Sequence, residues 1–112
     1  MEWMPQYMLQ FAYSPEAWKS LVQKPEDRSA AVDSICKSLG GRLVSLHYHM
    51  GEHDGTAIIE LPDDNTANAA VMAATASGAL RLSKTTRLYS AKEFVEALGK
   101  AAKASYRPPG KT

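Results

Sequence analysis

Two histidines separated by one residue, His47 and His49, have the type and spacing that most directly suggest chemistry in this sequence. On a strand, they would point to the same side, about 7 Å apart along the chain. Together with the carboxylate of Glu60, they could ligate Zn²⁺ or Fe²⁺. They could instead act as a general acid and base or orient a substrate, while Arg87 holds an anionic group. Since spacing fixes no third His or Cys, a polar network between two protomers is a third interpretation that stays open.

The two histidines belong to a predicted β-hairpin at residues 43–61. Apolar, aromatic and β-branched residues flank a short stretch with Gly and Asp, a pattern typical of strand, turn and strand. A two-residue turn at Glu52 and His53 would determine which residues lie opposite each other. The opposed pairs would then be His49 with Thr56, His47 with Ile58, and Ser45 with Glu60.

The same parity separates the side chains of the hairpin into two faces. One face is apolar and suits packing under helices; it would carry Val44, Leu46, Tyr48, Met50, Ala57, Ile59 and Leu61. The other would be joined by polar residues of the first and last strands and would carry Gln10, Ser45, His47, His49, Glu60, Thr85 and Arg87. This second face is too polar to be only a core. Its members Gln10, His47, His49, Glu60 and Arg87 form the candidate pocket.

The remaining segments predict the elements that position the hairpin. Residues 6–13 alternate with a period of two and predict a strand. A helix follows at 15–22, and Pro25 interrupts it because proline lacks a backbone donor. A second helix is expected to begin at Pro25 and to run as far as the Gly40-Gly41 pair.

Beyond the hairpin, residues 65–80 contain seven alanines and predict a helix that can pack closely against its neighbours. Residues 82–89 predict a fourth strand. Ser90 and Glu93 have the spacing of a capping box at the start of a final helix. Its apolar stripe, expected to be buried, consists of Phe94, Val95 and Leu98.

The resulting order, βαββαβα, predicts an α+β fold: a ferredoxin-like βαββαβ unit with an extra C-terminal helix. Right-handed crossovers give an antiparallel sheet in the order 4-1-3-2 with helices on one face. The uncovered face favours association, and two such sheets packed face to face would form a dimeric α+β barrel. We expect residues 1–105 to form a single domain and residues 106–112 to be a flexible tail.

The order of motifs in the hairpin resembles the GYD domain, a family of small bacterial proteins. The resemblance is carried by Gly40-Gly41, by the stretch Tyr48 to Asp54 and by the stretch Ala57 to Asp64, and it covers roughly residues 6–98. Of the namesake Gly-x-Tyr-Asp turn, this chain keeps Gly51 and Asp54 but has His53 in place of the Tyr. The resemblance implies a fold like that of the dimeric α+β barrels and no established activity.

Within this turn, we expect Gly51 to need a positive φ angle that alanine would not tolerate. His53 and Asp54 are expected to be structural, since an Asp in a turn can accept hydrogen bonds from nearby backbone amides.

Length and charge exclude several classes of protein. At 112 residues the chain is one domain, and its net charge of +1 gives no electrostatic case for binding nucleic acid or an anionic membrane. No segment approaches the ~20 apolar residues of a membrane span, so we expect a cytoplasmic protein. The single Cys36 cannot form an internal disulfide and is expected in the core.

Two functions fit these observations. The first is an oligomeric domain that binds a small molecule, or an enzyme-like domain that needs no cofactor, with a pocket between sheet and helices. The alternative is a non-catalytic assembly or partner-binding module whose polar sheet face is only a subunit interface. In both cases the chain's first partner is itself, and the sequence identifies no cofactor, substrate or reaction.

Overall fold

A four-stranded antiparallel sheet forms the body of the protein in the computed structural model, which describes residues 3–110. Its strands are β1 (Gln6–Tyr13), β2 (Arg42–Tyr48), β3 (Gly55–Glu60) and β4 (Leu80–Leu88). They lie in the order β2-β3-β1-β4, which is the predicted order 4-1-3-2 read from the other edge. The prediction of an α+β fold with this sheet is therefore confirmed.

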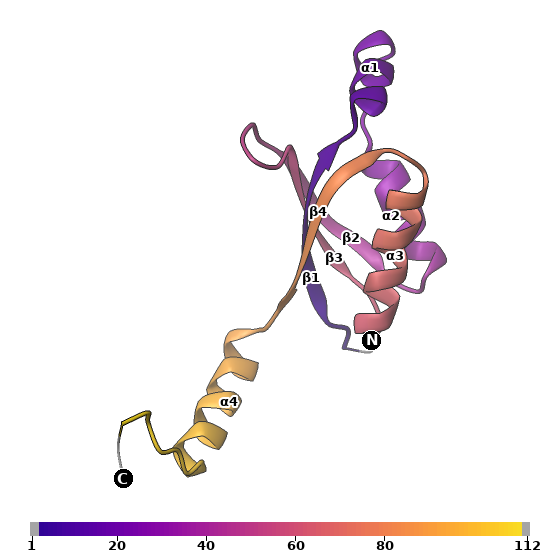
Figure 1. The fold of residues 1–112 in the computed structure, drawn as a ribbon. Helices are drawn as coiled ribbons and strands as arrows, with labels where there is room; N and C mark the ends of the chain where they lie inside the picture. Colours follow the sequence, from indigo (N-terminus) through magenta and orange to yellow (C-terminus); the bar gives the residue numbers. More distant parts are fainter. Residues whose placement is uncertain (1–2, 111–112) are drawn as a thin grey trace.

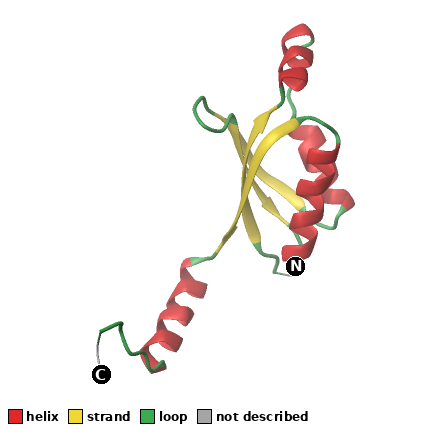
Figure 2. Ribbon diagram, in the orientation of Figure 1, coloured by secondary structure: helices red, strands yellow, loops and turns green. Residues whose placement is uncertain are grey.

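Within residues 3–110, two of the four helices cover one face of this sheet (Figure 1). These are α2 (Ser29–Ser38) and α3 (Asp64–Ala76). Helix α1 (Pro15–Gln23) stands beyond the upper end of the sheet, and α4 (Ala91–Lys103) extends from its lower end, as Figure 2 shows. No helix within residues 3–110 is long and apolar enough to cross a membrane.

Short polar side chains begin α1 and α4 where the sequence predicts. The Ser14 hydroxyl accepts the Ala17 amide at the start of α1. Ser90 and Glu93 form both hydrogen bonds of the predicted capping box at the start of α4. Helix α2 begins later than expected, because the Asp27 carboxylate accepts the Ser29 amide at 2.8 Å and keeps the residues after Pro25 out of the helix.

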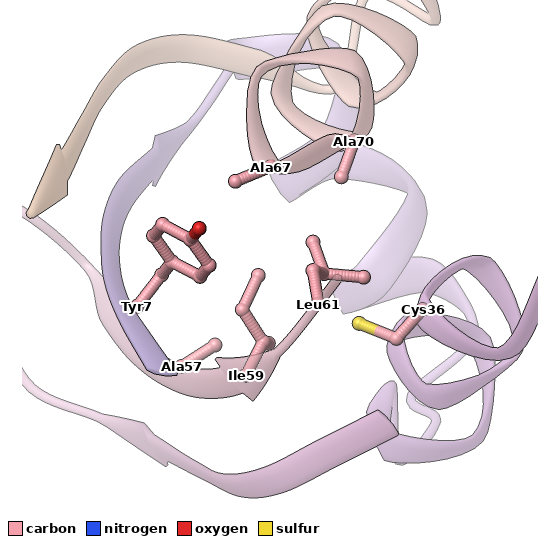
Figure 3. Packing of buried hydrophobic residues seen from close by; sticks show 7 residues of the cluster. All are labelled: Tyr7, Cys36, Ala57, Ile59, Leu61, Ala67 and Ala70. Atoms are coloured by element: carbon pink, nitrogen blue, oxygen red, sulfur yellow. The ribbon is translucent and has the colours of Figure 1, made fainter. Parts of the chain in front are cut away.

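The core lies between the sheet and helices α2 and α3 (Figure 3). Its buried members are Tyr7, Cys36, Ala57, Ile59, Leu61, Ala67 and Ala70. The alanines face the sheet from α3, and their small size lets this helix lie close to the strands. The burial of Cys36 agrees with its predicted place in the core.

The turn between β2 and β3 is longer than predicted. His47 pairs with Thr56 and Tyr48 with Gly55, so six residues, 49–54, make the connection, and the predicted pairs, such as His47 with Ile58, are wrong. The pairing shifted by two residues, which keeps each side chain on its predicted face of the sheet near the turn.

A long-range contact explains the longer turn. The Asp54 amide donates to the Phe11 carbonyl of β1 at 2.7 Å, and the His49 amide donates to the Asp54 carbonyl at 2.9 Å. These bonds close the loop at Asp54, so the residues before it do not extend the ladder. The expectation for Gly51 was also wrong: among the described residues, positive φ occurs only at Gly40, Gly78 and Gly110.

An irregularity in β2 changes which side chains face the helices at the end of the strand away from the turn. The register shifts between Leu43 and Ser45, so Val44 is an extra residue with no place in the ladder. Leu43 and Leu46 both pack against the core, whereas Val44 is exposed. Met50, also predicted to face the helices, is 83% exposed at the turn.

Helix α4 does not bury its apolar stripe against the described part of the chain, contrary to prediction. Phe94, Val95 and Leu98 are between 53% and 64% exposed. The described chain is accordingly long, 63 by 40 by 22 Å, with a radius of gyration of 17.9 Å against about 13 Å for a compact domain of this length. Helix α4 is followed by the predicted tail, whose last two residues, 111 and 112, lie outside the described part.

Candidate functional site

The sheet face opposite α2 and α3, here called the open face, carries three rows of side chains that follow from the strand register. The row nearest the β2–β3 turn consists of Lys84, Gln10, Thr56 and His47. The middle row consists of Thr86, Met8, Ile58 and Ser45. The last row consists of Leu88, Gln6, Glu60 and Arg42. Polar rows therefore enclose an apolar centre at Met8 and Ile58.

The predicted histidine pair does not meet Glu60. His47 and Gln10 lie in the first row with Thr56, and the His49 ring nitrogen Nε2 lies 2.7 Å from the Thr56 hydroxyl. Glu60 is four residues farther along β3, about 13 Å away at the rise of a strand. Within residues 3–110, no group of three or more His, Cys, Asp or Glu residues could hold a metal ion.

Glu60 has a different set of partners. Its carboxylate accepts hydrogen bonds from the Gln6 amide at 2.9 Å and from the Arg42 guanidinium at 2.8 Å. These bonds, that of Gln6 above all, lower the pKa of Glu60. Two changes produce this pairing. The longer turn moves the partner of Glu60 by two residues, from Ser45 to Leu43, and the extra residue Val44 moves it by one more, to Arg42.

Arg87 lies on the opposite side of the sheet from these residues. It pairs in register with Tyr7, so it faces the helices, and Thr85 lies on the same side. Its guanidinium is stacked 4.8 Å from the centre of the Tyr89 ring and approaches the carboxylates of Asp64 at 3.6 Å and Glu93 at 3.5 Å. The predicted placement of Arg87 in one pocket with His47 and His49 is therefore wrong.

Asp54 is the turn residue with the largest set of contacts. It is only 8% exposed, and its Oδ2 accepts the Tyr13 amide at 3.0 Å and the Trp18 indole N–H at 3.2 Å. Together with its backbone bond to Phe11, Asp54 joins the turn to the end of β1 and to α1. The predicted role of Asp54 as an acceptor of backbone amides agrees with this geometry, although the amide comes from β1 and not from the turn.

Gly55, the residue after Asp54, is required by close packing. A Cβ atom at this position would lie 2.4 Å from Cζ of Phe11, whose ring covers the backbone there. Phe11, Tyr13 and Tyr48 pack edge to face or stacked, with ring centres 5.3 to 6.3 Å apart. The Tyr13 and Tyr48 hydroxyls are 2.9 Å apart and share a hydrogen bond. Sequence reasoning did not find this aromatic cluster, since its members come from separate segments of the chain.

A cavity of about 260 Å³, here called the helix cleft, lies between the sheet and helices α2 and α3. Its lining is almost entirely apolar, with Leu9, Phe11, Val32, Ile35, Ile59 and the α3 alanines Ala70, Ala73 and Ala74. Arg28, Ser77 and Cys36 also line it. Burial raises the pKa of the Cys36 thiol, so this thiol stays protonated at neutral pH.

Two further cavities lie at the ends of the sheet. One, of about 400 Å³, is bordered by Tyr13, Trp18, Tyr48 and Asp54 at the upper end and is here called the aromatic cavity. The other, of about 500 Å³, lies where α4 leaves the sheet and includes Trp3, Arg42, Glu60 and Glu93.

A comparison with models of known protein families identifies the family of this chain. Residues 7–98 match the family model described as the GYD domain. The chain belongs to the GYD domain family. Among proteins of curated function, none matches this GYD domain. The crystal structure of PA3566 from Pseudomonas aeruginosa is similar to it with a TM-score of 0.43 and 15% sequence identity, over 80% of this chain and 97% of that chain.

The namesake turn of this GYD domain is Gly51-Glu52-His53-Asp54. Gly51 lies at an open position with no heavy atom of another segment within 4 Å of an added Cβ. His53, in place of the Tyr, is half-buried. Asp54 is the member of the turn whose hydrogen bonds connect the hairpin to β1 and α1.

Proposed function

We propose that this GYD domain binds a small apolar molecule in the helix cleft. The observation that carries the proposal is the cavity itself, because core residues of a protein of this size normally fill the space between sheet and helices. The alanines of α3 leave that space open on one side, and Arg28 stands at its border.

The size and lining of the cleft define the class of ligand. Its volume of about 260 Å³ exceeds the ~150 Å³ of an apolar cavity that takes up benzene and is just below the ~300 Å³ at which typical ligand sites begin. A compound with one ring, or a short alkyl chain, is therefore the best fit. Arg28 could meet a carboxylate at the border, although its guanidinium also pairs with Glu26 at 2.8 Å.

The ionisable groups of the cleft favour binding over covalent catalysis. Cys36 and Tyr13 both line it, and burial raises the pKa of each. Both side chains are therefore protonated at neutral pH, and neither is an activated nucleophile.

Thermal unfolding with single-ring and short-chain compounds, such as benzoate, benzyl alcohol and hexanoate, tests the proposal. A ligand at 100 times its Kd stabilises the folded state by about 2.7 kcal/mol and raises the midpoint. The variant Ala74→Phe should fill the cleft and abolish this shift, whereas Ala69→Phe on the exposed side of α3 should retain it. A panel that shifts no midpoint, or shifts those of all three proteins equally, would contradict binding in the cleft.

A second proposed function, assembly into a homodimer through the open face, is supported by a separate observation. Met8 and Ile58 form the apolar centre of that face, and α4 exposes the apolar stripe of Phe94, Val95 and Leu98. Two copies packed face to face would cover this apolar centre, and the apolar stripe of each α4 could pack against the other copy. Light scattering should then give twice the 12.2 kDa of one chain, and Ile58→Arg should return the mass to that of a monomer.

A further inference from the structure

We propose that the aromatic cavity is a binding site for an organic cation, specifically an alkylated ammonium group. This inference does not depend on the proposed function of the helix cleft. Tyr13 and Arg28 line both cavities, but the two sites differ in the charge and shape of the ligand that each would take.

The first argument is the arrangement of the rings. The Tyr13 and Trp18 planes are turned 82° from each other with centres 5.4 Å apart, and Tyr48 lies 6.3 Å from Tyr13 in a stacked orientation. Aromatic faces attract cations that lie within about 6 Å of the ring centre, and walls in several orientations suit an ammonium carrying methyl groups. The cavity, at about 400 Å³, has room for such a group.

The second argument is that the walls are fixed before any ligand arrives. The Tyr13 and Tyr48 hydroxyls share a hydrogen bond of 2.9 Å, and the Trp18 indole N–H donates to Asp54 at 3.2 Å. Tyr13 is buried, whereas Tyr48 is half exposed and forms the outer wall. A preformed site costs less conformational entropy on binding.

The third argument is charge. The carboxylate of Asp54 is buried, and within residues 3–110 no Lys, Arg or His lies within salt-bridge distance of it. A buried carboxylate without a cation is unfavourable, so a cationic ligand would compensate it. Glu26 and Asp27 add two carboxylates at the border, against the single guanidinium of Arg28, which already pairs with Glu26.

The fourth argument distinguishes an organic cation from a metal ion. Metal ions need several oxygen, nitrogen or sulfur ligands around one point, and no such group of side chains occurs in the described chain. The rest of the cavity is apolar, with Leu21, Pro25 and Met50 beside the rings. Such walls suit methyl groups around a positive charge.

Choline is a suitable probe, and its uncharged isostere 3,3-dimethyl-1-butanol is the matched control compound. Titration of the full chain is followed by the indole N–H signals in NMR, and a Trp3→Phe variant assigns the signal of Trp18. We expect choline, but not the neutral alcohol or an equal concentration of NaCl, to move the Trp18 signal with a saturable curve. An equal response to the neutral alcohol would overturn the proposal, because it would show that charge is not recognised.

Variants locate the site. Tyr48→Leu should weaken choline binding at least fivefold, and Glu26→Gln, a border substitution with little risk to folding, should weaken it about twofold. The control Tyr106→Leu removes an exposed tyrosine outside the cavity and should leave the affinity unchanged. Equal choline affinity in the wild type, Tyr48→Leu and Glu26→Gln would refute the assignment.

A final comparison identifies the source of the cation. A peptide with trimethyllysine, its unmethylated counterpart and free choline are titrated in parallel. Stronger binding of the methylated peptide would support a modified protein as the ligand, and stronger binding of choline would support a small molecule. Failure of both choline and the methylated peptide to bind would refute the proposal, whatever the outcome for the helix cleft.

Discussion

Replacement of Asp54 by alanine should destabilise the fold strongly, although it removes a charge that lies buried without a cation. Asp54→Ala leaves the buried Tyr13 amide without an acceptor, which costs about 1–3 kcal/mol. The half-buried Trp18 indole can turn partly to water, so its lost bond adds about 1 kcal/mol. Relief of the buried charge works in the opposite direction but does not restore the acceptor. The two lost bonds together amount to about 2–4 kcal/mol, and we expect the net loss to lie below that sum by the amount of the charge relief. A loss of this size is a large fraction of the 5–15 kcal/mol typical of a domain.

Urea unfolding measures this loss, and an unchanged slope m would show that the mutation alters stability rather than the extent of unfolding. Asp54→Asn keeps an acceptor without the charge and should lose about half as much, whereas Glu52→Ala, an exposed change in the same turn, should stay within about 0.5 kcal/mol of wild type. A double-mutant cycle with Trp18→Phe separates the indole bond from the rest. If Asp54→Ala were as stable as wild type, relief of the buried charge would outweigh both hydrogen bonds, and the Asp54 side chain would not stabilise the fold.

Four other substitutions test smaller features. Ser90→Ala removes the capping box and should cost the final helix about 0.5–2 kcal/mol, visible as lower helicity by circular dichroism with little change in the unfolding of the sheet, because α4 projects from it. Gly51→Ala should be neutral, whereas Gly40→Ala, at φ +88°, should cost about 1 kcal/mol or more; equal urea midpoints for the two variants would contradict the backbone geometry. Since its folded pKa is lowered, Glu60 contributes stability above its unfolded pKa near 4.5, and this contribution is lost as the pH falls through the folded value. Glu60→Gln should therefore reduce the dependence of stability on pH in the acid range, and an unchanged acid profile would show that Gln6 and Arg42 do not stabilise the carboxylate.

The sequence predicts the order of elements and the sheet because those depend on local patterns. The alternation in residues 6–13 identifies β1 and its buried side, and the serines at positions 14 and 90 identify two helix starts. The candidate pocket depends on register instead. The contact between Asp54 and Phe11 lengthens the turn, and one extra residue at Val44 shifts the pairing again. The partners of His47 and Glu60 therefore do not follow from spacing in the sequence.

Faces and partners are harder to predict for the last strand and helix. Polar Arg87 turns toward the helices because aromatic rings and the carboxylates of Asp64 and Glu93 receive its guanidinium there, and only the folded chain brings these groups together. For α4, the spacing of Phe94, Val95 and Leu98 shows that the helix has an apolar side. This spacing contains no information about which surface would cover the apolar side of α4.

The central place of β1 in the sheet has a consequence for synthesis of the chain. This strand leaves the ribosome first, yet Gln6 pairs with Glu60 on one side and with Leu88 on the other. Its second neighbour, β4, is therefore the last strand of the sheet to be made. Folding of the sheet must wait for β4, and contacts over such long stretches are slow to form. Until then, β1 has at least one unpaired edge that can recruit strands from other nascent chains.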